Sequence, residues 1–170
     1  MSLEGLTHAQ SEAHPRRTPL GIWAIDEIFV DHTWRSSHDP DDDFAFLRVS
    51  QAKPTSTLQA RTGAERLGLN PAAGQLTTVV AYPASTDQAI TCKAALLKFS
   101  ATQLEFDCDG YSNGTSGSAL VIDPDPTTGL GIAIGAIGGY QQGGTTSTTS
   151  YAAAFTTTTK TLYTRALRST

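Results

Sequence analysis

The chain has 170 residues, a net charge of −4 at pH 7 and a hydrophobic fraction of 39%. This length can bury a substantial core, and the acidic balance argues against nucleic acid as a partner. No apolar run of about 18 residues is present in the sequence, so no membrane-spanning helix is expected. The chain also holds 25 Thr and 15 Gly but only 4 Lys and 1 Met. Thr favours strands and Gly favours turns, which predicts an all-β fold.

The first segment, Met1–Arg17, has no feature of a folded element. It lacks the basic start, the apolar centre and the small-residue cleavage site of a signal peptide, and it shows no strand-like alternation. We therefore expect residues 1–17 to be a disordered leader or the stub of a longer segment.

Two strand regions are expected in the first third of the chain. Leu20–Asp31 is apolar and β-branched, with a charged break at Asp26-Glu27, and reads as one or two strands. His32–Asp42 is polar and is expected to be a loop. Asp43–Val49 is a short, nearly continuous apolar run, which is typical of a strand buried on both sides. The mixed segment Ser50–Gly74 contains Pro and Gly breaks and is interpreted as a connector between two subdomains.

The rest of the chain carries strand signals at regular spacing, which favours a sandwich or a barrel. The expected strands are Leu76–Tyr82, Ala89–Phe99, Gln103–Cys108, Ala119–Ile122 and Leu130–Ile137. The second and third of these are expected to form a hairpin across Ser100–Thr102. Gly138–Thr149 reads as a loop, and Thr156–Leu167 as a short terminal helix with a Thr cap.

The two cysteines, Cys92 and Cys108, lie 16 positions apart. This spacing excludes a CxxC redox motif, and the histidines lie too far upstream to complete a zinc site. One disulfide in a secreted protein fits the even count, and it would contribute about 3 kcal/mol in the chain-entropy model. The alternative is a pair of buried free thiols in a cytosolic protein.

The turn at Gly114–Ala119 is the first candidate for chemistry. A Ser between glycines can expose its hydroxyl and direct nearby backbone N–H groups at one point, as a nucleophile beside an oxyanion hole requires. An ordinary Gly/Ser/Thr turn is the alternative.

Asp43, at the head of an apolar strand, could hold the tautomer and orientation of a histidine. The alternative is a solvated acidic turn, to which we assign Asp41 and Asp42. Gly138-Gly139 offers bare backbone for pairing with an extended peptide, or is part of an ordinary loop.

These blocks together resemble a known family. Asp43-Phe44-Ala45-Phe46-Leu47 precedes the Ser116 turn, and Ser116 lies 73 positions after Asp43. This arrangement is similar to the Asp and Ser blocks of the trypsin-like, chymotrypsin-fold serine peptidases, and most similar to their secreted actinobacterial branch. The resemblance runs from about Thr18 to Ala166. It also covers Pro19–Trp23, Cys108–Tyr111, Ile137–Gly144 and Ser150-Tyr151. It implies a double β-barrel and peptide-bond hydrolysis through an acyl-enzyme.

Residue by residue, the resemblance makes Ser116 the nucleophile and Asp43 the acid of the triad. Gly114 and Ser116 match the residues whose N–H groups form the oxyanion hole. Gly138 and Gly139 match the end of the substrate-pairing strand, and Cys92 with Cys108 matches a disulfide of this branch. The Ser block departs from the wider family at three positions, with Thr115 in place of Asp, and Ser118 and Ala119 in place of Gly and Pro. The floor of the specificity pocket cannot be assigned by this resemblance.

The catalytic histidine has no matching block. In the family it lies in a Thr-Ala-Ala-His-Cys block about 50 residues before the Asp, and counting back from Asp43 runs past Met1. His8 is the nearest candidate, but its neighbours do not match. His14, His32 and His38 are interpreted as surface residues. We therefore expect an N-terminally truncated chain with an incomplete N-terminal barrel. Its parts would be a barrel remnant at 18–52, a connector at 53–75, and the C-terminal barrel with its helix at 76–170.

Three functions remain open from the sequence. The first is a serine endopeptidase acting on peptides or proteins, weak or inactive in this chain because the base is missing. The second is a non-catalytic pseudopeptidase or peptide-binding β domain, and the third is a plain structural β domain. The resemblance implies no metal or cofactor, and an extracellular location for the full-length parent.

Overall fold

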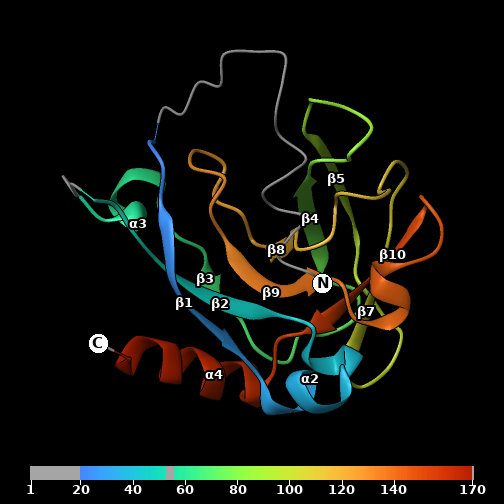
Figure 1. The fold of residues 1–170 in the computed structure, drawn as a ribbon. Helices are drawn as coiled ribbons and strands as arrows, with labels where there is room; N and C mark the ends of the chain where they lie inside the picture. Colours follow the sequence, from blue (N-terminus) through green and yellow to red (C-terminus); the bar gives the residue numbers. More distant parts are fainter. Residues whose placement is uncertain (1–19, 53–55, 170) are drawn as a thin grey trace.

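The computed structural model describes residues 20–52 and 56–169 (Figure 1). The fold is mostly β, with a main sheet that closes into a barrel and a helix at its C-terminal end. The expected leader at residues 1–17 lies outside the described residues. No helix in the described part of the chain is both long enough and apolar enough to cross a bilayer.

A two-stranded antiparallel sheet precedes the barrel. It pairs β1 (Ala24–Val30) with β2 (Ala45–Ser50), and the register shifts between Ile25 and Glu27, at the charged break in the sequence. The strand expected from Asp43 to Val49 is therefore present. The expectation that it is buried on both sides is wrong, because Leu47 remains 48% exposed. Within the described residues this sheet has no third strand, so the outer edge of each strand has no strand partner.

The segment between β1 and β2 is not the plain loop that was expected. It forms the short helix α2 (His32–Ser37) and the 3-10 turn η1 (Pro40–Asp42). The Asp31 carboxylate caps α2 by accepting from the Thr33 N–H at 2.9 Å, and the Thr33 hydroxyl also donates to Asp42. Side-chain caps of this kind can stabilise a helical turn without any apolar periodicity in the sequence.

The expected connector also contains regular structure. It includes α3 (Leu58–Thr62) and the two-residue strand β3 (Arg66–Leu67). β3 runs parallel to the start of β9. The Glu65 carboxylate next to β3 accepts a hydrogen bond from the Gly131 N–H. Part of the connector is thereby joined to the main sheet.

The main sheet contains eight strands of the described chain, seven of them in the order β5-β4-β8-β9-β10-β7-β6, with β3 added beside β9. Their bounds are β4 (Leu76–Ala81), β5 (Ile90–Ala95), β6 (Leu97–Lys98), β7 (Gln103–Asp107), β8 (Ala119–Ile122), β9 (Ile132–Ile137) and β10 (Thr149–Ala154). β10 was not among the expected strands, because its three alanines weaken the β signal.

One bent stretch of chain closes this sheet. The region expected as a single strand, Ala89–Phe99, divides at the buried residue Leu96. β5 pairs with β4 before that point, and β6 pairs with β7 after it. Because β5 and β6 are the two ends of the strand order, the bend at Leu96 joins the ends and closes the barrel. The hairpin expected between the second and third strands exists only in its second half.

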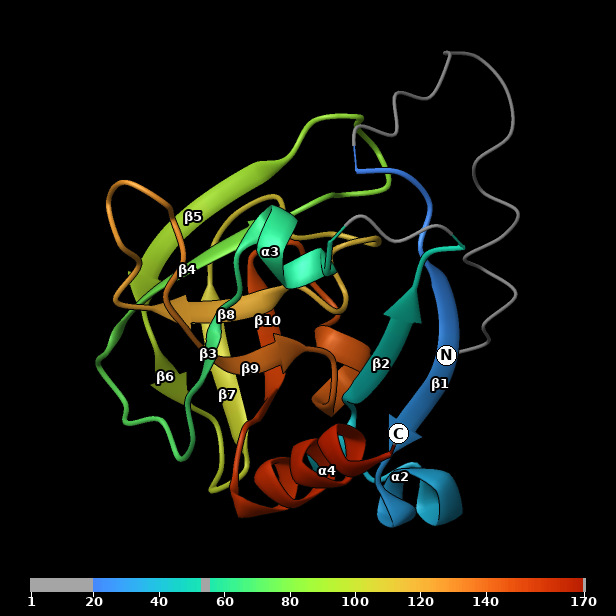
Figure 2. The same ribbon diagram turned by 90° about the vertical axis from the view of Figure 1, so that its left-hand side faces the viewer.

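The barrel interior is mainly apolar. In β4, Val79 and Ala81 point inward and are fully buried, as are Leu96 and Leu104. The helix α4 (Thr157–Arg168) packs against β1 and β2 (Figure 2). Its Thr156 cap was expected from the sequence, and Thr159 completes a reciprocal capping box. The rings of Phe46 in β2 and Tyr163 in α4 pack against each other with a centroid distance of 5.2 Å.

Candidate active site

The Ser116 turn is held together from inside by Thr115. The side chain of Thr115 is buried, and its hydroxyl donates to the Ser112 carbonyl at 2.9 Å. The Ser118 N–H donates to the Thr115 carbonyl at 3.1 Å. The turn therefore forms with Thr115 and Ser118 at two of the positions where the sequence departs from the wider family pattern. Ser116 itself remains exposed.

Gly114 occupies a position that tolerates no side chain. Its φ is +97°, and a Cβ placed there would lie 2.5 Å from the Ala84 nitrogen and 2.9 Å from the Tyr82 carbonyl oxygen. The neighbouring loop approaches this closely because the Ala84 N–H donates to the Asn113 carbonyl at 2.7 Å. The close approach fixes the peptide plane that precedes Thr115.

The N–H groups of Gly114 and Ser116 donate no hydrogen bond to any other residue that the structure describes. The Gly117 N–H, in contrast, donates to the Ile137 carbonyl at 2.7 Å. An exposed turn with two free N–H groups beside a serine hydroxyl is an arrangement that can stabilise a developing oxyanion.

Ile137, at the end of β9, connects this turn to the barrel. It accepts from Gly117 and donates its own N–H to the Ser118 carbonyl at 2.9 Å. The next residue, Gly138, donates to the Tyr151 carbonyl of β10 at 3.1 Å. The position of the Ser116 turn is thus fixed relative to the Gly138-Gly139 pair.

The Asp43 carboxylate contacts the backbone just after the end of β9. Its Oδ2 accepts a hydrogen bond from the Gly139 N–H at 2.9 Å, and its side chain is half-buried. A Cβ on Gly138 would lie 2.9 Å from the same oxygen, so only glycine allows this approach. The structure thereby brings the Asp43 and Ser116 segments to one short stretch, residues 137–139, although they lie 73 positions apart in sequence.

A cavity of about 480 Å³ opens beside Ser116. Three segments line it: Ala84 and Ser85; Tyr111, Ser112, Asn113, Thr115 and Ser116; and Gln142 to Ser147, with Ile137 at the junction. None of these described lining residues is an Asp, Glu, Lys, Arg or His. The Tyr111 hydroxyl donates to the Val79 carbonyl at 2.8 Å, and burial raises the pKa of this phenol. The cavity wall is therefore polar but uncharged at neutral pH.

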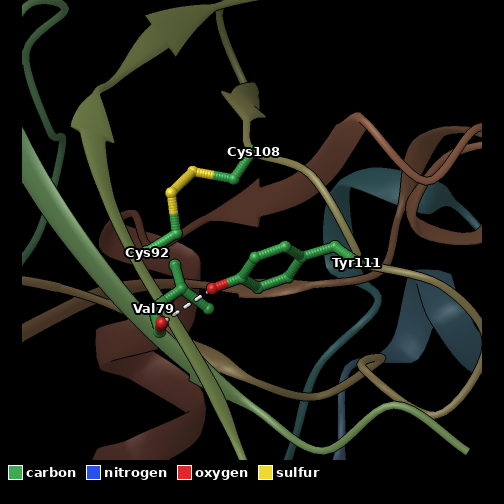
Figure 3. The surroundings of a disulfide bond; sticks show 4 residues. All are labelled: Val79, Cys92, Cys108 and Tyr111. Atoms are coloured by element: carbon green, nitrogen blue, oxygen red, sulfur yellow. Dashed lines mark hydrogen bonds between the residues drawn. A yellow bond between two sulfur atoms is a disulfide. The ribbon is translucent and has the colours of Figure 1, made fainter.

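The expected disulfide between Cys92 and Cys108 is present (Figure 3). It joins β5, at one end of the strand order, to the residue that follows β7, near the other end. It lies close to the Tyr111–Val79 hydrogen bond (Figure 3). The disulfide and this hydrogen bond both anchor the start of the segment that leads to Ser116.

The histidines do not complete a triad within the described residues. His32 is the first residue of α2 and His38 is its C-cap, and both are exposed. The His38 ring lies against Trp34, with a centroid distance of 5.5 Å. Neither imidazole hydrogen-bonds to Asp43 or Ser116 in the described part of the chain. His8 and His14 lie outside it.

Asp41 and Asp42 are not the solvated pair that was expected. Both are half-buried. Asp41 accepts a hydrogen bond from Gln103 at 2.8 Å, and Asp42 accepts from the Thr33 hydroxyl. Burial raises the pKa of Asp42, and the nearby carboxylates of Asp31 and Asp39 raise it further. No group of three side chains suited to a metal ion lies among residues 20–52 and 56–169.

Comparison with solved structures identifies the architecture. The fold is that of the chymotrypsin-like serine proteases. A thermostable serine protease, AL20, from an extremophilic microorganism superposes with a TM-score of 0.73 at 21% identity, covering 88% of this chain and 69% of its own. The protease Anisep from Arthrobacter nicotinovorans gives a TM-score of 0.73 at 20% identity with the same coverage.

A Glu endopeptidase gives a TM-score of 0.63 at 15% identity, covering 84% of this chain and 62% of its own. No protein-family model matches the sequence, and no curated protein does either. The likeness is therefore one of fold, and the assignment of individual residues depends on the geometry above.

Proposed function

We propose that this chain carries the nucleophile and the acid of a serine endopeptidase site. The Ser116 Oγ would attack the carbonyl carbon of a peptide bond while its proton passes to a general base. The tetrahedral oxyanion would be held by the N–H groups of Gly114 and Ser116. On collapse the base would return that proton to the leaving nitrogen, the C–N bond would break to release the amine, and the acyl-enzyme left on Ser116 would be hydrolysed by water. Asp43 would orient and stabilise the base.

One observation carries this proposal. The exposed Ser116 turn has an adjoining cavity and two N–H groups that donate to no residue among those described, and it is bonded to the same stretch of backbone that Asp43 contacts. A turn with a purely structural role would not require the Asp43 carboxylate to bind the backbone at residues 137–139. The likeness in fold to several proteases supports the same interpretation.

The uncharged cavity supports a preference for substrates with a neutral side chain next to the scissile bond. Polar groups from Ser112, Asn113, Thr145 and Thr146 surround the space, and a charged side chain placed there would lose hydration without gaining an ion pair. Arg, Lys, Asp and Glu at this position are therefore disfavoured. The disulfide supports an extracellular site of action, since such bonds persist in oxidising compartments.

The base determines how fast Ser116 can react. Without an imidazole bonded to its hydroxyl, a serine is a weak nucleophile. We therefore expect slow reaction of Ser116 with a fluorophosphonate probe, located by mass spectrometry of the labelled peptide. Added imidazole should accelerate the labelling at Ser116, and the Asp43→Ala variant should lose most of that acceleration.

The control is Ser118→Ala, two positions away in the same turn, which should leave the labelling of Ser116 intact. Ser116→Ala should abolish it. Labelling spread over many serines, or no labelling of Ser116 with or without imidazole, would contradict the peptidase proposal. Rapid labelling without imidazole would show that the chain itself supplies a base.

The second candidate is a peptide-binding domain without catalysis. The absence of any imidazole beside Asp43 or Ser116 in the described residues favours it. In that case neutral peptides should bind in the cavity with unchanged affinity in Ser116→Ala, while imidazole-dependent labelling is absent. Calorimetry with the same peptides separates the two candidates.

A further inference from the structure

The buried amide of Gln103 links the two loops that meet at Asp43. Gln103 is the first residue of β7 and is only 4% exposed. Its Nε2 donates to the Pro40 carbonyl and to Asp41 Oδ1, both at 2.8 Å. Its Oε1 accepts from the Tyr140 N–H at 3.1 Å. Both amide protons and the carbonyl oxygen are therefore used.

The partners of Gln103 lie directly beside the candidate catalytic groups. Pro40 and Asp41 belong to η1, and Asp43 directly follows its last residue. Tyr140 begins the 3-10 turn η2 (Tyr140–Gly143) and follows Gly139, whose N–H donates to Asp43. The η1 and η2 segments are thus joined twice, once directly by the Gly139–Asp43 hydrogen bond and once through the Gln103 side chain.

The Gln103 bridge requires a glycine at position 139. Its φ is +75°, and a Cβ there would lie 2.6 Å from Gln103 Oε1 and 2.8 Å from the Pro40 carbonyl oxygen. Any side chain at this position would push the amide away from both loops. The glycine expected only for substrate pairing therefore has a second reason to be glycine.

We propose that Gln103 is a positioning residue that holds the Asp43 carboxylate on the Gly139 N–H by clamping η1 onto the start of η2. This inference rests on the proposed role of Asp43. An amide suits the task because it donates to two oxygens and accepts from one N–H at the same time. A carboxylate in its place would face the Pro40 and Asp41 oxygens with no proton to donate.

The direct test measures amide hydrogen exchange in Gln103→Met, which keeps the length of the side chain and removes its hydrogen bonds. The exchange of the Gly139 amide should accelerate about tenfold relative to the nearby Ile137 amide, because its acceptor is no longer held in place. The matched control is Thr159→Val, which removes a hydrogen bond made by a fully buried side chain in α4. It should leave the Gly139-to-Ile137 ratio unchanged.

If Gln103→Met does not fold, Asp41→Ala removes one partner of the amide on the loop side and should move the ratio in the same direction by a smaller factor. An unchanged ratio in the folded variants would overturn the proposal.

A second test uses the imidazole-assisted labelling rate of Ser116. Gln103→Met should slow it roughly tenfold or more, as misplacement of a catalytic group does. Combined with Asp43→Ala it should cause no further loss, because Gln103 acts through Asp43. Additive losses would overturn the proposal. If wild-type Ser116 does not react at all, the peptidase proposal fails, and the exchange ratio alone decides the role of Gln103.

Discussion

Two glycines of the Ser116 turn provide a matched pair of perturbations. Gly114 and Gly117 both have left-handed backbone, with φ of +97° and +86°. A Cβ on Gly114 would lie 2.5 Å from the Ala84 nitrogen, whereas a Cβ on Gly117 would meet no heavy atom within 4 Å. Substitution by alanine therefore adds the same conformational strain at both positions, and adds a backbone clash at only one.

The magnitudes follow from these contacts. Left-handed backbone costs an alanine about 1–2 kcal/mol, which is the whole effect expected for Gly117→Ala. The clash in Gly114→Ala adds about 1–3 kcal/mol, as overpacking usually does. For a chain of this size each kcal/mol lowers Tm by roughly 2–4 °C. Gly114→Ala should therefore melt roughly 2–12 °C below Gly117→Ala.

The assay is thermal and urea unfolding of both variants with the disulfide intact. Labelling of Ser116 provides a second measurement, because a displaced oxyanion donor costs about 100-fold or more in rate. Gly114→Ala should lose this factor and Gly117→Ala should lose much less. Equal stability losses in the two variants would refute the reasoning from the Ala84 contact.

Three further predictions concern the barrel and its acidic loop. Replacing Cys92 and Cys108 by serine should lower the free energy of unfolding by about 3 kcal/mol, measured by urea titration. Tyr111→Phe leaves the Val79 carbonyl without its hydroxyl donor and should cost about 1–3 kcal/mol. Because the pKa of Tyr111 is raised by burial, wild-type stability should fall above about pH 10, and Tyr111→Phe should weaken that fall. Because the pKa of Asp42 is raised by burial, its contribution to stability is lost as pH rises above about 4, and Asp42→Asn should flatten this part of the stability curve.

The sequence predicted the elements whose signals are local. α4 begins at Thr156 because a threonine hydroxyl can cap the first turn. The core strands β4, β8 and β9 were expected from short β-branched runs between turn residues. The Ser116 turn was expected from its glycines. β10 was not expected from the sequence, because alanine has little strand preference. Its hydrogen bonds to β7 and β9 define β10 as a strand.

Other features depend on which segments meet. The run from Ala89 to Phe99 reads as one strand, and its division at Leu96 exists only because the chain changes partner from β4 to β7. The apolar strand β2 looked buried on both sides, but burial depends on neighbours, and the described chain supplies only β1 as a strand partner and the helix α4 beside it. Gln103 carried no signal, since an isolated polar residue at a strand start is usually exposed.

The amino-acid sequence by itself determined an all-β chain, a glycine-flanked serine, an acid at the head of a strand and a pair of cysteines. Those features follow from side-chain size, backbone freedom and spacing, which act within a few residues. Only the tertiary structure decided that Asp43 and Ser116 meet through residues 137–139, that the cavity beside Ser116 is uncharged, and that Gln103 ties the two loops together. These depend on closure of the barrel, which brings together segments that no local pattern can pair.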